Sequence, residues 1–188
     1  MKKIFVSFLY VLFTLILYSQ IGCKQSPVEP STDYNLLSNG SFELNNTPTL
    51  EGWRFGNQQL TKLSSDVPPN GGNWSLQLTS DWAPTTGFVY APITNIKSGN
   101  IIRLSAFVRA TGKFGGRGII TLSVGPKVYN GHMKSSSSSD TVWNQISVTD
   151  TLTLSSSDTL WVILSAPVTE IIPFRQLFDL VKLEKVAN

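Results

Sequence analysis

Short β-prone runs recur along the chain from about Tyr34 to its end, and clusters of Gly, Pro, Asn, Asp and Ser separate them. None of the runs shows the 3.6-residue apolar period of an amphipathic helix. Many short strands without a helix predict an all-β sandwich or barrel. The predicted strands are Gly40–Leu44, Gln58–Leu63, Trp74–Thr79, Gly87–Ile93, Ile101–Ala110, Gly118–Val124, Thr141–Thr149, Thr159–Ala166 and Leu177–Lys185.

Several predicted strands alternate between apolar and other residues, which gives each of them two faces. One face is uniformly apolar and is predicted to form the core. The opposite face carries Phe107, Arg103 and Arg109 in one strand and Trp161 in another. An aromatic ring facing away from the core either contacts a ligand or lies under a loop. The core-facing residues are Ile102, Leu104, Ala106, Val108, Ile120, Leu122, Val124, Leu160, Val162, Leu164 and Ala166.

The N-terminus has the pattern of an export signal. Lys2 and Lys3 precede an apolar run from Ile4 to Leu17, which is shorter than the roughly 20 residues that span a bilayer. A buried core helix is the alternative, but the run has no polar face at helical spacing.

Cys23, the only cysteine of the chain, directly follows Gly22 a few residues after the apolar run. This segment resembles a bacterial lipoprotein signal, although Gln20 stands where Leu is usual. The resemblance implies cleavage before Cys23, acylation of its thiol, and anchoring at a bacterial cell envelope. The anchored protein would face the periplasm or the cell surface, at the outer membrane in a Gram-negative cell. An ordinary export signal with a leftover thiol is the alternative.

The remaining chain divides into a linker and one domain. Residues 23–33 contain two prolines and no periodicity, so they predict a flexible linker. Residues 34–188 are enough for one packed domain. We therefore expect a lipoprotein signal peptide over 1–22, a lipidated cysteine with its linker over 23–33, and the folded domain after it.

Charge and residue counts exclude several functions. Fifteen basic and twelve acidic residues give a net charge of +3, and loss of Lys2 and Lys3 lowers it to +1. A nearly neutral chain gives no electrostatic attraction to nucleic acid. One Cys and one His exclude internal disulfides, thiol–imidazole zinc clusters and paired catalytic histidines. No nucleophile motif is present, so we expect no enzyme, although twelve acids leave a glycosidase pair open.

Five segments together resemble carbohydrate-binding modules of the family 4, 9 and 22 kind. They occur in the family's order and cover the chain from about Tyr34 to Val186. Each segment is a weak signal alone, whereas their order and spacing are moderately specific. The segments are Asn35–Glu43 followed by Gly52-Trp53, Gly71–Leu78, Ser98–Arg109, Trp143–Val148 and Phe178–Leu183.

The resemblance implies a galactose-binding-like jelly-roll β-sandwich of two antiparallel sheets. Its concave sheet or its edge loops would bind a polysaccharide or oligosaccharide. It also implies a structural Ca²⁺ near the first and last strands, with Glu43 and Asp179 as ligands, while Leu180 replaces the second Asp of the closing motif. Two carboxylates completed by backbone carbonyls suit this cation. The alternative is that both acids cap strand ends and pair with lysine.

A sugar ring has an apolar CH face and a rim of hydroxyls, so its site needs aromatic platforms beside planar hydrogen-bonding groups. We predict contacts from Trp82, Phe107, Arg109 and Trp161, with Arg103, Tyr90 and Gln145 behind them. Trp82 has the alternative role of a plug over the sandwich edge. Trp53, Trp74 and Trp143 match positions that are mostly core in the family, and Tyr129 and His132 are interpreted as loop residues.

These observations predict a membrane-anchored lipoprotein with a non-catalytic glycan-binding domain. The alternative is an adhesion or assembly module on the same sandwich, whose outward aromatic residues meet a protein partner at the cell envelope. Fold resemblance does not decide between them, because function depends on the site.

Overall fold

The computed structural model describes residues 34–80, 86–111, 116–167 and 174–187. The chain divides into two compact units, Met1–Thr32 and Asp33–Asn188, and the described residues belong to the second unit. The predicted signal peptide, Cys23 and Trp82 lie outside them. No helix within the described ranges is long and apolar enough to cross a membrane.

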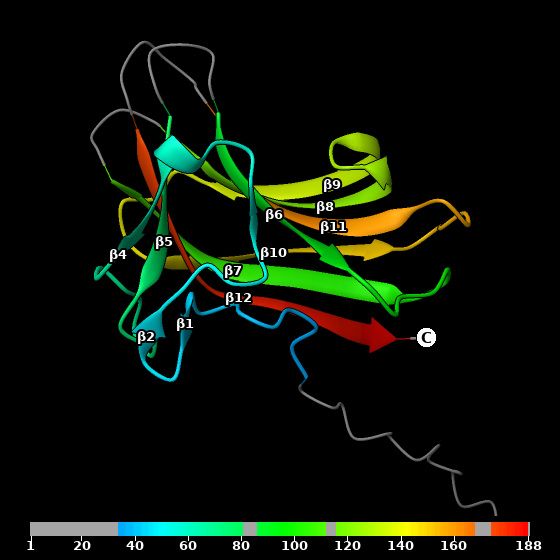
Figure 1. Cartoon of the computed structure of the whole chain (residues 1–188), viewed down its shortest axis with the longest axis horizontal. Coiled ribbons are helices and arrows are strands. Elements are labelled where there is room, and N and C mark those ends of the chain that lie inside the picture. Colours follow the sequence, from blue (N-terminus) through cyan, green and yellow to red (C-terminus); the bar gives the residue numbers. More distant parts are fainter. Residues whose placement is uncertain (1–33, 81–85, 112–115, 168–173, 188) are drawn as a thin grey trace, which may run out of the picture. The chain divides into compact units, whose positions relative to one another are not determined.

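Two five-stranded antiparallel sheets form this unit (Figure 1). The first sheet has the order β10-β7-β12-β5-β4, and the second has the order β3-β6-β11-β8-β9. A separate ribbon pairs β1 (Glu43–Leu44) with β2 (Thr47–Pro48). The first sheet contains β4 (Thr61–Ser64), β5 (Ser75–Thr79), β7 (Ile101–Thr111), β10 (Asn144–Thr151) and β12 (Arg175–Ala187). The second contains β3 (Arg54–Phe55), β6 (Gly87–Ile93), β8 (Gly118–Lys127), β9 (Asn130–Ser138) and β11 (Thr159–Ala166).

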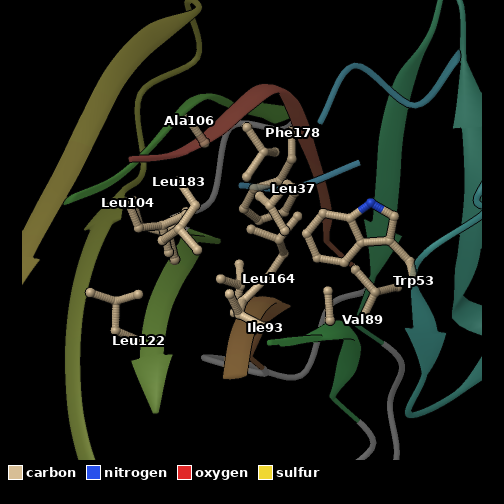
Figure 2. Close-up of a cluster of buried hydrophobic side chains, with 14 of the residues drawn as sticks. Leu37, Trp53, Val89, Ile93, Leu104, Ala106, Leu122, Leu164, Phe178 and Leu183 are labelled. Carbon is tan, nitrogen blue, oxygen red and sulfur yellow. The ribbon is translucent and has the colours of Figure 1, made fainter. Parts of the chain in front are cut away.

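The core lies between the two sheets, as the alternation predicted. Figure 2 shows Leu104 of β7 and Leu183 of β12 facing Leu122 of β8 and Leu164 of β11. All the apolar residues assigned to the core from β7, β8 and β11 are buried. Trp53 closes one side of the core, where its indole N–H donates to the carbonyl oxygen of Asn39 at 2.7 Å. Together with the similar structures described below, this arrangement confirms the predicted jelly-roll sandwich.

Three predicted elements differ from the structure. The first predicted strand, Gly40–Leu44, is limited to the two residues of β1. The reason is that Phe42, Asn45 and Asn46 have positive φ angles of 58°, 51° and 61°, which extended strands do not allow. The strand expected from Gln58 begins instead as a 3₁₀ turn, η1 (Gln58–Leu60), in which the Asn57 side chain accepts the N–H of Gln59. His132, interpreted as a loop residue, lies in strand β9, which was not among the predicted strands.

Strands β9 and β10 are neighbouring edge strands of different sheets, and a hydrogen bond and an ion pair join them. His132 Nε2 of β9 lies 2.9 Å from Asp150 Oδ2 of β10, and Lys134 Nζ lies 3.5 Å from Asp150 Oδ1. The side chain of Asp150 is mostly buried between them. These contacts connect the two layers along one open side of the sandwich.

Candidate functional site

The predicted sugar-contacting residues are divided between the outer faces of the two sheets. Phe107 and Arg109 lie on β7 of the first sheet, on the side opposite the buried alternate residues. Trp161 lies on β11 of the second sheet, opposite the core residues Leu160, Val162 and Leu164, and shares its outer face with the buried Ile163 and Ser165. Because both inner faces meet in one core, the outer faces point in opposite directions. These three residues therefore do not share one groove.

Arg109 is held in a hydrogen-bonded network on the first sheet. Its Nη1 donates to Asp66 Oδ1 and Oδ2 at 2.8 and 2.6 Å, and its Nε donates to the carbonyl oxygen of Thr141 at 3.0 Å. Trp143 Nε1 also donates to Asp66 Oδ1, at 3.1 Å. Asp66 belongs to the loop between β4 and β5, so Arg109 fastens this loop to the sheet. Trp143, expected in the core, lies half-buried in this network instead.

Phe107 is half-buried beside this covering loop. Its Cα partners are Gln145 on β10 and Asp179 on β12. Leu177 projects to the same outer face and is fully covered, although it is not part of the core between the sheets. Pro68 of the covering loop is buried as well. Part of the outer face of the first sheet is thus buried.

The second sheet carries four aromatic rings on its outer face, which we call the aromatic surface: Phe88, Tyr90, Tyr129 and Trp161. The rings of Phe88 and Tyr90 stack with centroids 6.0 Å apart. Trp161 meets Tyr90 edge-on at 5.9 Å, and Tyr129 meets Phe88 edge-on at 5.2 Å. Edge-to-face and offset arrangements at these spacings are favourable. The four rings thus form one connected cluster outside the core.

Strand alternation and two close contacts position these rings. In β6, Phe88 and Tyr90 face outward, and Val89 between them is buried. Gly56 passes so close to the Phe88 ring that a Cβ atom there would overlap the ring carbons. Trp161 Nε1 donates to the carbonyl oxygen of Gly125 at 3.1 Å, which fixes the indole plane. A fixed ring loses little conformational entropy when it binds a ligand.

The tip of the β8–β9 hairpin folds back over the second sheet (Figure 1). The tip and Phe88 belong to opposite ends of β11. Gly125, at the base of the tip, pairs with Thr159 at the first end of β11, and Phe88 pairs with Ser165 near the other end. Tyr129 at the tip nevertheless reaches the Phe88 ring. Burial raises the pKa of the Tyr129 hydroxyl, and a side-chain hydrogen bond with Ser165 opposes the rise. Tyr129 stays 41% exposed, so its ring is both anchored and accessible.

Hydroxyl groups surround the aromatic surface. Thr121, Ser123 and Ser165 project from β8 and β11 to the same outer face. Thr121 Oγ1 and Ser135 Oγ of β9 lie 2.8 Å apart and share a hydrogen bond. The buried hydroxyl of Ser123 has no partner within the described part of the chain. Thr121, Ser123 and Ser165 are 4%, 0% and 7% exposed, so their hydroxyls lie beneath the rings and do not face a ligand.

A second feature is the carboxylate pair, Glu43 and Asp179, beside the first sheet. The backbone of β12 bulges here, because the register shifts after Asp179 and Leu180 has a φ of 48°. Asp179 is fully buried, and its Oδ1 accepts the N–H of Leu180 at 2.7 Å. Its Oδ2 has no hydrogen-bond partner among the described residues. Burial and the nearby Glu43 charge raise the pKa of Asp179 to about 7, against the backbone hydrogen bond.

Two glycines bring the backbone close to the carboxylate pair. A Cβ atom on Gly71 would lie 2.6 Å from Asp179 Oδ2, and one on Gly72 would overlap the Glu43 carboxylate. Glu43 Oε2 accepts the N–H of Asn73 at 2.9 Å. In the described ranges, no three His, Cys, Asp or Glu side chains gather to hold a metal. A hard cation here would therefore complete its oxygen ligands from the backbone, and the buried, unpartnered Oδ2 fits such a cation.

Sequence reasoning missed two members of the aromatic surface. Phe88 belongs to the alternating segment Phe88-Val-Tyr90 in a strand whose bounds were predicted correctly, so its outward position could have been derived. Tyr129 was interpreted as a loop residue and does lie in the turn between β8 and β9, with a φ of 59°, but its place in the aromatic surface was not predicted. The folding back of the hairpin tip depends on tertiary contacts that no local pattern carries.

No family model matches the sequence, and no curated protein does. Several known structures match its fold. A family 61 carbohydrate-binding module in complex with β-1,4-galactotriose is 14% identical, with a TM-score of 0.55 over 81% of this chain and 99% of that one. A family 16 carbohydrate-binding module is 18% identical, with a TM-score of 0.61 over 80% of this chain and 100% of that one.

The family 22 xylan-binding domain of a Paenibacillus barcinonensis protein is also similar. It is 16% identical, with a TM-score of 0.58 over 84% of this chain and 98% of that one. The chain therefore has the jelly-roll sandwich fold of carbohydrate-binding modules, which confirms the predicted resemblance at the level of the fold.

Proposed function

We propose that this protein is a non-catalytic glycan-binding protein, and that its aromatic surface binds a polysaccharide or oligosaccharide. The observation that carries the proposal is the cluster of four rings on the outer face of the second sheet, in a fold shared with carbohydrate-binding modules. Trp161, with its indole plane fixed by Gly125, is the largest platform and lies at the Tyr90 end of the cluster. Tyr90 and Tyr129 add phenol groups that can hydrogen-bond sugar hydroxyls.

Phe107 and Arg109 are not part of the proposed site. They lie on the opposite sheet, where Arg109 already holds Asp66 and the Thr141 carbonyl. Trp82 stays a predicted contact, because it lies outside the described residues.

The expected affinity is modest. Covering roughly 100 Å² of apolar ring surface at about 25 cal/mol per Å² gives about 2.5 kcal/mol for each platform, before the cost of ordering the ligand. Two platforms with a few hydrogen bonds reach the micromolar to millimolar range. Such a protein retains a polymer by repeated weak contacts rather than by one tight site.

The positions of the charged groups support a non-catalytic role. Glu43 and Asp179, the acids that approach each other, lie beside the first sheet, away from the aromatic surface. His132 is paired with Asp150 at the edge between the sheets. Neither pair belongs to the aromatic surface, and glycoside hydrolysis needs two carboxyl groups on either side of the bond.

Calcium is the cation we propose for the carboxylate pair. Glu43 and Asp179 would hold it with backbone carbonyl oxygens, as a hard cation prefers. When bound, the ion would neutralise two carboxylates and fasten the glycine segment at Gly71 to the bulge in β12. This role is structural, since the pair lies on the other sheet from the aromatic surface.

We further propose that cleavage before Cys23 and acylation of its thiol anchor the domain at a bacterial cell envelope. The basis is the order of charged, apolar and small residues before the only cysteine of the chain. Residues 23–33 then serve as the linker between the anchor and the domain.

Affinity gel electrophoresis in galactan and in xylan tests the glycan proposal. We expect the parent protein to be retarded in at least one of the two gels. Trp161→Ala removes the indole platform. The retardation of this variant should therefore be lost, while its melting temperature falls by only a few degrees. Phe107→Ala and Arg109→Ala are matched controls on the opposite sheet and should migrate like the parent.

Two outcomes would count against this assignment. Equal retardation of Trp161→Ala and the parent would move the site away from the aromatic surface. Failure to bind any glycan on an array, together with Trp161-dependent capture of an envelope protein, would replace glycan binding with the adhesion or assembly role.

A further inference from the structure

A pocket of about 350 Å³ opens beside the aromatic surface. Its walls are residues 36–39 together with Tyr34, the turn at Gly52-Trp53, and the end of β6 with the two residues after it, 91–95. Pro92 is shared by the pocket and the second sheet, where it is the Cα partner of Trp161. The pocket therefore lies at one end of the proposed glycan site.

The sequence explains why the sheet opens at this place. Strand β3 pairs with β6 through Arg54 with Tyr90 and Phe55 with Val89, and Gly56 donates its N–H to the carbonyl oxygen of Phe88. The next position of β6 in this hydrogen-bonding series is Pro92, which has no N–H to donate.

The opposite strand also ends at this position. Gly52 turns the chain away with a φ of 86°, a conformation that suits glycine. The two strands thus separate beyond Tyr90, and the space between them is the pocket.

The chemistry of the walls is neutral. Every residue that lines the pocket is uncharged, with apolar surface from Leu36, Trp53 and Pro92 and polar groups from Ser38, Thr94 and Asn95. A carboxylate or sulfate placed here would lose its hydration without gaining a cationic partner. An apolar surface beside neutral hydrogen-bonding groups suits a sugar ring instead.

Asn39, which lines the pocket, is 3% exposed. Its Nδ2 donates to the carbonyl oxygens of Thr49 and Glu51 at 3.0 and 3.2 Å, and its own carbonyl oxygen accepts Trp53 Nε1. The side-chain oxygen Oδ1 has no hydrogen-bond partner in the described part of the structure. Buried acceptors without a partner are uncommon, and a sugar hydroxyl can donate to this atom once the side chains around Asn39 shift to uncover it.

We infer that this pocket binds one neutral sugar unit, the end or a side branch of a glycan whose other units lie on the aromatic surface. This inference rests on the proposed glycan-binding function and adds the chemical class of the ligand: a neutral sugar, recognised in part by Asn39 Oδ1 as acceptor. Uronic acids are excluded from the pocket.

The test combines a blocking variant with NMR. Ser38→Trp places a large ring at the exposed rim of the pocket, and Ser65→Trp, at an exposed position of the β4–β5 loop, is its matched control. The probes are β-1,4-galactotriose, xylotetraose and trigalacturonic acid. We expect a neutral probe to shift the Trp53 indole N–H and Asn39 side-chain resonances of the full chain. Ser38→Trp should weaken binding of that probe at least tenfold, and Ser65→Trp should not.

The outcomes separate this inference from the proposed function. If Trp161→Ala abolishes glycan binding while Ser38→Trp has no effect and the Trp53 resonance does not move, the pocket assignment is wrong and the aromatic surface stands. Stronger binding of trigalacturonic acid with shifts at Asn39 overturns the neutral class. If no glycan binds and Trp161→Ala changes nothing, the proposed function fails, and this inference fails with it.

Discussion

Glu43 and Asp179 are separated by most of the domain in sequence, yet the bulge in β12 brings their carboxylates together under a glycine segment. A buried carboxylate whose second oxygen has no partner destabilises the fold when it is charged. The family resemblance implied both residues, Glu43 through the opening motif and Asp179 through the closing motif, and their role as calcium ligands stays a prediction. It could not indicate how deeply Asp179 is buried, because burial depends on the covering segment around Gly71.

Calcium should stabilise the protein through this pair. At a free concentration one hundred times its dissociation constant, the gain is about 2.7 kcal/mol, which raises the melting temperature by roughly 5–10 °C for a domain of this size. In Asp179→Asn the calcium response should vanish. In chelator at pH 8 this variant should be at least as stable as the parent, because it no longer buries a charge.

Calorimetry with and without chelator measures both effects. Glu51→Gln is the control, since it alters an exposed carboxylate elsewhere and should keep the full calcium response. An unchanged calcium response in Asp179→Asn would show that the cation binds at another place.

The Tyr129 hydroxyl makes the stability of the protein depend on pH. Burial raises the pKa of its hydroxyl above the ordinary value of 10.0, so the fold favours the neutral phenol. The stabilisation that this provides is complete below the unfolded pKa and is lost as pH rises through the folded pKa. Between about pH 10 and pH 12, the parent should therefore lose more stability than Tyr129→Phe.

Urea unfolding at several pH values measures this difference. At pH 7 the variant should be less stable by about 0.5–1.5 kcal/mol, because it lacks the hydrogen bond with Ser165. A constant gap between the two proteins from pH 7 to pH 12 would mean that the Tyr129 hydroxyl is not held by the fold.

The strands show which structural features a local sequence pattern can predict. β6 and β11 were predicted with the correct bounds, since each has regular alternation of apolar and other residues between turn-forming segments. β9 was missed because its residues Ser135–Ser138 have little apolar surface and low strand propensity. It forms because β8 offers it a hydrogen-bonding edge along most of its length. Pairing of this kind depends on the neighbouring strand, which a local pattern does not include.

The packing of β3 against β6 leads to a prediction for Gly56. A methyl group at this position would overlap the Phe88 ring, so Gly56→Ala must push the ring out of the aromatic surface. We expect a loss of about 1–3 kcal/mol in stability from this overpacking. Glycan retardation should weaken together with it, because Phe88 supports both Tyr90 and Tyr129.

Gly99→Ala provides the comparison at a second glycine. Gly99 has open space around its Cβ position and a φ of 87°, so its alanine variant is strained in the backbone but leaves the aromatic surface unchanged. Retardation should be preserved in Gly99→Ala even where stability falls. If Gly56→Ala binds glycan as well as the parent does, Phe88 is not a part of the site.

For the whole molecule, the proposed weak sites and the proposed lipid anchor would have one physical explanation. A single domain that binds in the micromolar to millimolar range releases a polymer quickly, whereas many copies fixed on one surface bind the same polymer at several points. Several acyl chains at Cys23 would make the attachment to the membrane effectively permanent. The predicted linker of residues 23–33 would let neighbouring domains adjust to one polymer chain.

Cys23→Ser tests this explanation because it removes the acylated thiol and leaves every described residue unchanged. In bacterial cells that express the full chain, the parent should fractionate with membranes and incorporate an alkyne-labelled fatty acid. The variant should do neither.

The second test concerns avidity. Cells carrying the parent should bind the glycan at least a hundredfold more strongly than the isolated domain binds it in solution, as linked binding sites allow. Cells that express Cys23→Ser at the same protein level as the parent should lose that retention. If both proteins sediment with membranes to the same extent, the anchor is not at Cys23, and surface avidity must then come from another part of the chain.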